Sequence, residues 1–186
     1  MSRTNTLRMV QCALFAAITA VCAQIIIPIG PVPVSLSLLP VILCGALLSP
    51  GSSAISMTVY LLLGAVGAPV FSGLSGGVDK LLGPTGGYIV GYVPCVLIIG
   101  LLTKRLRYPS RFRIPVTAGA MALGILVCYA VGTAWFVVGT HRTLTDALAV
   151  CVWPFLPFDA LKIAIAVAVA LRVGPAVAGL RPVRGD

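Results

Sequence analysis

Residues 116–138 read VTAGAMALGILVCYAVGTAWFVV, a continuous stretch without a charged side chain. About 20 predominantly apolar residues are enough for an α-helix to cross the hydrocarbon core of a membrane, so this stretch predicts a membrane-spanning helix. The rest of the chain has the same character, because 59% of its 186 residues are hydrophobic and only 9% are charged. Soluble domains carry about 25% charged residues. The composition therefore excludes an ordinary water-soluble globule and a disordered chain.

Five further apolar runs predict the other helices. They cover residues 9–29, 34–48, 54–71 and 88–102, and a last run over 147–173 that the segment Trp153–Pro157 interrupts. The first run resembles a signal peptide, but it is longer than the roughly 7–15 residues of a signal core, so we expect it to be retained. The predicted fold class is an all-α integral membrane protein with about six transmembrane helices, forming one domain over residues 1–186.

The formal charge of +9 indicates the orientation of these helices. If the chain starts inside and crosses six times, ten of its 13 Lys and Arg residues lie inside, Lys162 falls within a span, and only Lys80 and Arg142 lie outside. The ten are Arg3, Arg8, Lys104, Arg105, Arg107, Arg111, Arg113, Arg172, Arg181 and Arg184. Cytoplasmic loops carry an excess of Lys and Arg, so both termini are predicted to be cytoplasmic, in a multi-pass protein of the plasma membrane. The cations then act as topology signals, and nucleic-acid binding is not expected.

Asp159 and Lys162 are the strongest candidates for a functional site. They are three residues apart, so they share one face of a helix that Pro157 can start. A charged side chain at the centre of a membrane costs about 2.5–3.5 kcal/mol on insertion scales, and such residues usually serve a function. Two interpretations remain open. Either the two charges only neutralise each other, or Asp159 accepts hydrogen bonds from a ligand's N–H groups while Lys162 meets a carboxylate.

The segment 72–87, which is rich in glycine and proline, is the second candidate. Glycine adopts positive φ and lets the backbone approach a ligand closely. Irregular backbone at membrane depth occurs only where it is buried in protein or lines a cavity, although this segment is alternatively an ordinary outer loop. The candidate ligand contacts here are Gly73, Gly76, Gly77, Pro84, Thr85, Gly86 and Gly87. Phe71 and Tyr88 beside them offer flat faces for a ring system, unless they are interfacial anchors.

Other features of the sequence carry less chemistry. No Ser/His/Asp set, carboxylate pair or group of metal ligands can be assembled from the sequence, so we expect no enzyme activity, no cofactor and no metal.

Ala13 and Ala17 belong to a face of small residues on the first helix. Such a face lets helices approach closely, and it serves either internal packing or docking to another membrane subunit.

Four segments of the chain stand out together: GAPVFSG (67–73), GG (76–77), GPTGGY (83–88) and PFLPFDALK (154–162). They resemble those of the BioY family, the biotin-capturing S components of energy-coupling-factor (ECF) vitamin transporters. The resemblance extends over the whole chain in its length, its number of apolar runs and the order of its motifs.

The resemblance implies a six-helix protein that binds biotin at its extracellular end and has no ATPase of its own. It also implies docking, through Ala13 and Ala17, to a membrane coupling (T) subunit driven by a pair of cytoplasmic ATPases. Asp159 is then expected to bind the ureido N–H groups of biotin, and Lys162 its carboxylate. The alternative is a stand-alone secondary transporter or channel for a small organic acid, with Asp159 and Lys162 as an intramembrane proton or ion site.

Overall fold

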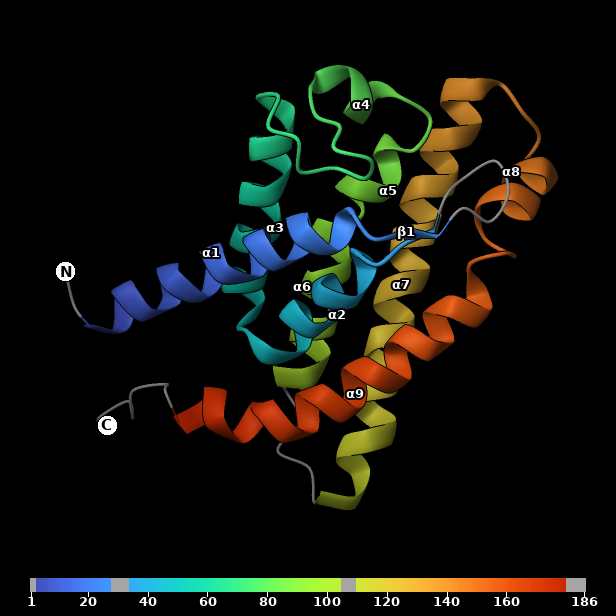
Figure 1. Cartoon of the computed structure of the whole chain (residues 1–186). Coiled ribbons are helices and arrows are strands. Elements are labelled where there is room, and N and C mark those ends of the chain that lie inside the picture. Colours follow the sequence, from blue (N-terminus) through green and yellow to red (C-terminus); the bar gives the residue numbers. More distant parts are fainter. Residues whose placement is uncertain (1–2, 28–33, 105–109, 180–186) are drawn as a thin grey trace.

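The computed structural model of the protein describes residues 3–27, 34–104 and 110–179. It is almost entirely helical (Figure 1), as the sequence predicts. The elements are α1 (Arg3–Ala23), β1 (Ile26–Ile27), β2 (Val34–Ser35), α2 (Leu38–Leu47), α3 (Pro50–Ala65), α4 (Val78–Leu82), α5 (Gly86–Val90), α6 (Tyr92–Lys104), α7 (Ser110–Thr140), α8 (Leu144–Cys151) and α9 (Leu156–Gly179). The two short strands pair antiparallel, with Ile26 opposite Ser35.

Some residues used in the sequence analysis lie outside the described ranges. They are residues 28–29 of the first apolar run, and Arg105, Arg107, Arg181 and Arg184 of the charge count.

Each apolar run corresponds to one helix or to one pair of helices. Within the described residues, three stretches are long and apolar enough to cross a membrane: Asn5–Ala23, Gly86–Thr103 and Arg113–Thr140. The helices α8 and α9 add a fourth if this pair, bent by 52°, forms one span. With 10 residues, α2 is only about 15 Å long at a rise of 1.5 Å per residue, about half of the hydrocarbon core. The number of six spans and the cytoplasmic termini therefore remain predictions.

The core is built around α6, which packs against α2, α3 and α7. Ile99 of α6 is fully buried. A Cβ at Gly45 of α2 would lie 2.9 Å from Ile99 Cβ, and one at Gly124 of α7 would lie 2.6 Å from Ile99 Cγ1. Glycine at these two positions thus lets both helices approach α6 closely. The last helix, α9, packs against α2 and α7, which are two of the helices around α6.

The glycine-rich segment is only partly irregular. Residues 66–77 form a loop, in which Gly73 and Gly77 adopt positive φ values of 78° and 97°. The prediction of irregular backbone is wrong for α4 and α5, which are helices of five residues each. Gly86 belongs to α5, where a Cβ would overlap the carbonyl oxygen of Leu81. Glycine is therefore required here by close packing of α5 on α4, which lie in the upper part of Figure 1.

Candidate ligand-binding site

A cavity of about 170 Å³ lies between the glycine-rich segment, α7 and the start of α9. Its polar lining consists of Ser35, Ser72, Lys80, Thr85, Asp159 and Lys162. Leu38, Tyr88, Ile89, Tyr92, Tyr129 and Phe155 supply most of its apolar surface, and Cys128 and Cys151 complete it. A mostly apolar pocket with a few convergent polar groups is the usual form of a small-molecule site.

Asp159 and Lys162 form a buried ion pair, with 2.9 Å between Lys162 Nζ and Asp159 Oδ1. Both residues are almost fully buried, at 3% and 6% exposure. Pro157 is the second residue of α9, so the pair occupies the first turns of this helix, as the sequence predicts. Lys162 Nζ also donates to the carbonyl oxygen of Ser35 at 3.0 Å. The lysine is therefore held by β2 as well as by Asp159 of α9.

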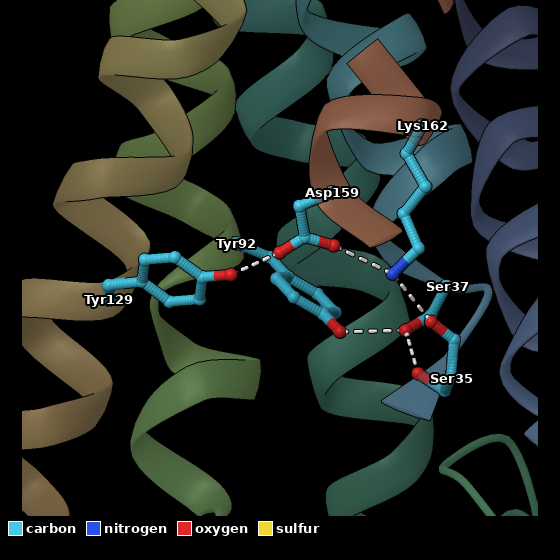
Figure 2. A network of polar contacts seen from close by, with 6 residues as sticks. All are labelled: Ser35, Ser37, Tyr92, Tyr129, Asp159 and Lys162. Carbon is cyan, nitrogen blue, oxygen red and sulfur yellow. Dashed lines mark hydrogen bonds and ion pairs between the residues drawn. The ribbon is translucent and has the colours of Figure 1, made fainter. Parts of the chain in front are cut away.

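Tyr129 and Tyr92 extend this pair into a network that sequence reasoning missed (Figure 2). The Tyr129 hydroxyl, from α7, donates to Asp159 Oδ2. The Tyr92 hydroxyl lies 2.7 Å from Ser37 Oγ, which in turn lies 2.7 Å from Ser35 Oγ. A tyrosine buried in an apolar run needs a partner for its hydroxyl, and this requirement is the signal by which both tyrosines could have been found.

The network leaves Asp159 able to bind more. An ionised carboxylate has about four acceptor positions. Two of them are used, by Tyr129 and Lys162. Asp159 lines the cavity, so its remaining acceptor capacity is available to N–H groups of a ligand.

The structure brings only part of the predicted set to this cavity. Of the candidate contacts, Thr85, Tyr88, Asp159 and Lys162 line it. Phe71, Gly73, Gly76, Gly77, Pro84, Gly86 and Gly87 are not among its lining residues. The segment 72–87 contributes through Ser72 and Lys80 instead.

Phe71 faces the core and not the cavity. Its side chain is fully buried, and its ring meets Tyr60 edge-on, with centroids 5.5 Å apart. A Cβ at Gly64 would overlap the same ring. The physical reason for this placement is that α3 offers Phe71 a glycine-sized recess. The expectation of a flat ligand-binding face is therefore not met at this residue.

Tyr88 belongs to α5, and its side chain packs against α7. Its hydroxyl is 3.0 Å from Thr133 Oγ1, and its ring covers Gly132, where a Cβ would overlap it. Trp135 Nε1 donates to the carbonyl oxygen of Gly83 at 3.2 Å. These contacts fix the GPTGGY segment against α7, with one face of Tyr88 on the cavity.

Gln24, just after α1, is a second residue that sequence reasoning missed. Its Nε2 donates to the carbonyl oxygen of Phe71 at 3.2 Å and to that of Pro69 at 3.5 Å. Its Oε1 accepts from the backbone N–H of Leu74 at 2.8 Å. One side chain thus clamps the loop that carries Ser72 to the end of α1. A polar side chain inside an apolar run is the signal, but the sequence does not identify its distant partners.

Ala13 and Ala17 are exposed on α1, whereas Cys12 and Ala16 are buried. The backbone of Cys12 faces α3, where Ser56 Oγ donates to its carbonyl oxygen at 2.7 Å. The two alanines therefore do not serve the packing of α1 against α3, and their role in docking remains a prediction.

Comparisons with known proteins support one family. The sequence matches the model of the BioY family over residues 1–179. It is 40% identical to a probable biotin transporter BioY of Pyrococcus horikoshii, over 87% of this chain and 92% of that protein. It is 35% identical to a biotin transporter BioY of Thermotoga maritima, over 89% of this chain and 95% of that protein. The structure resembles the crystal structure of the S component for biotin from an ECF-type ABC transporter, with a TM-score of 0.85 and 27% identity over 93% of this chain and 94% of that one. The chain belongs to the BioY family.

Proposed function

We propose that this protein is the biotin-binding S component of an ECF-type uptake transporter, a multi-pass protein of the plasma membrane that captures biotin at the extracellular side. The observation that carries the proposal is the buried Asp159–Lys162 pair on a mostly apolar cavity, in a chain that belongs to the BioY family.

The chemistry of biotin suits this cavity. Its ureido ring has two N–H donors and one carbonyl acceptor, on a largely apolar bicycle. Asp159 accepts from the ureido N–H groups, and the Tyr129 hydroxyl and Lys162 hold its carboxylate in place. Leu38, Ile89 and Phe155 pack against the bicycle. Hydrogen bonds in a mostly apolar site of low dielectric constant are stronger than in water, so few polar groups suffice for tight binding.

Uptake also requires partners that supply energy. We place a T subunit and two cytoplasmic ATPases beside this chain. The solved structure that it resembles is an S component from such a transporter, and the exposed Ala13 and Ala17 offer a small-residue face to a neighbouring helix. The relatives are named as transporters, and we propose no catalytic reaction.

The test is equilibrium binding of labelled biotin to the purified protein in detergent, without ATP and without an ion gradient. We expect saturable binding at one site per chain, and no comparable binding of a panel of other vitamins. Asp159→Asn should weaken it by about tenfold or more, equivalent to about 1.4 kcal/mol. Absence of biotin binding would overturn the proposal. Uptake by the protein alone in liposomes, driven by a proton gradient, would instead support a secondary transporter.

A further inference from the structure

The two lysines that line the cavity differ in their contacts. Lys162 Nζ already has two oxygen partners, Asp159 Oδ1 at 2.9 Å and the carbonyl oxygen of Ser35 at 3.0 Å. Lys80, in α4, lines the same cavity and is partly exposed. Over the ranges that the structure describes, its ammonium group forms no hydrogen bond or ion pair. Lys80 is thus the lysine with a free charge.

The charges of the lining are unbalanced by one. Asp159 and Lys162 neutralise each other as an ion pair. Lys80 is the remaining charged residue of the described cavity wall, so the wall carries one net positive charge. A ligand with a single negative charge would neutralise it.

Two hydroxyl side chains of the segment 72–87 line the cavity together with Lys80. Thr85, whose hydroxyl makes no capping bond to α5, and Ser72 line the cavity with it. Ammonium and hydroxyl groups donate well to an anionic oxygen, and the ammonium group accepts nothing. The donors that the segment 72–87 contributes to the cavity lining therefore suit a carboxylate.

Lys80 and Asp159 line the cavity from different elements. Lys80 lies on α4, which packs against α3 and α5, whereas Asp159 lies on α9, which packs against α2 and α7. Leu38, Ile89 and Phe155 supply apolar surface to the same cavity. The lining thus suits a molecule with a hydrogen-bonding head, an apolar middle and an acidic tail.

We infer that Lys80 binds the carboxylate of the ligand's tail and determines the preference of the site for an acid over its neutral analogue. This inference rests on the proposed function. It replaces the sequence-based assignment of that carboxylate to Lys162, whose ammonium group is engaged by Asp159 and Ser35.

The experiment compares the affinities of biotin and biotinamide, which differ only in the charge and donor pattern of the tail. We expect the unmodified protein to prefer biotin by about tenfold, because biotinamide lacks the negative charge that pairs with the Lys80 ammonium group. Lys80→Gln should lower the affinity for biotin and leave that for biotinamide within about threefold, so that the preference nearly disappears. Lys80→Arg should restore most of the preference. Retained binding of biotinamide shows that each variant is folded.

Arg142→Gln is the matched control. Arg142 is predicted on the same side of the membrane as Lys80, but it does not line the cavity. The variant should keep the preference for biotin. An unchanged preference in Lys80→Gln would overturn the inference, as would equal binding of the two compounds by the unmodified protein or an equal loss in Arg142→Gln. Absence of binding of both compounds by the unmodified protein would instead contradict the proposed function.

Discussion

The Tyr129 hydroxyl of α7 donates to Oδ2 of Asp159, the oxygen that Lys162 does not contact. The carboxylate is thereby held from two helices, α7 and α9, and its orientation toward the cavity is set before a ligand arrives. Prior orientation lowers the cost of ordering side chains on binding.

Removal of this hydroxyl tests its role. We expect Tyr129→Phe to weaken biotin binding by about three- to tenfold, because a typical hydrogen bond contributes about 0.5–1.5 kcal/mol. Thr140→Val is the control, since the Thr140 hydroxyl also donates one hydrogen bond, to the carbonyl oxygen of Phe136 at 2.7 Å, and Thr140 does not line the cavity. Equal affinities of the two variants for biotin, measured by calorimetry, would show that the Tyr129 hydroxyl does not contribute to binding.

The contribution of the Asp159–Lys162 ion pair to the stability of the protein can be tested by removing one charge or both. Lys162→Met leaves a buried carboxylate without its cation, and breaking a buried pair in this way costs about 3–5 kcal/mol. Asp159→Asn together with Lys162→Met removes both charges, so we expect this double variant to melt at a higher temperature than Lys162→Met alone. Melting followed by tryptophan fluorescence in detergent measures the difference. A double variant that is no more stable than the single one would show that Lys162 does not stabilise the charge of Asp159.

The sequence predicts a site residue correctly where the residue type is unfavourable in its own segment. Asp159 and Lys162 stand out because ionisable groups in apolar runs are rare, and their spacing determines their pairing. Phe71 could not be placed in this way, since its burial depends on the recess at Gly64 on another element. The loop residues that Gln24 contacts lie 45 to 50 residues further along the chain, and no local pattern reveals them. The apolar run over residues 34–48 also predicts a longer helix than α2, because the first part of this run forms β2 and a turn.

The glycine at position 87 is predicted to be necessary for packing. A Cβ there would overlap the side chain of Trp135, and overpacking of this kind costs about 1–3 kcal/mol. Gly87→Ala should therefore lower the melting temperature and also weaken biotin binding, because Trp135 holds Gly83 against α7. Gly119→Ala, at a position of α7 where a Cβ meets nothing within 4 Å, should have no such effect. Equal melting curves would contradict the packing argument.

Gln24 is predicted to position the loop that carries Ser72. Gln24→Ala removes the side chain's hydrogen bonds to Phe71, Pro69 and Leu74. We expect biotin affinity to fall by about fivefold, equivalent to about 1 kcal/mol, and the amide hydrogen of Leu74 to exchange faster. Gln11→Ala, on α1, is the control. Unchanged exchange at Leu74 would show that the loop holds its conformation without this clamp.

The exposed alanines of α1 provide a test that separates docking from ligand binding. Ala13→Trp and Ala17→Trp add bulk to a surface away from the cavity, so the affinity for biotin should not change. In vesicles that also contain the T subunit and the ATPases, we expect ATP-dependent biotin uptake to fall by about tenfold or more, because small residues are what allows two helices to approach closely. Leu126→Trp on α7 is the control, since Leu126 is 57% exposed and belongs to another helix. Its uptake should stay close to that of the unmodified protein. Loss of both binding and uptake in the alanine variants would show that Ala13 and Ala17 support the fold itself, whereas unchanged uptake would place the docking surface on another face.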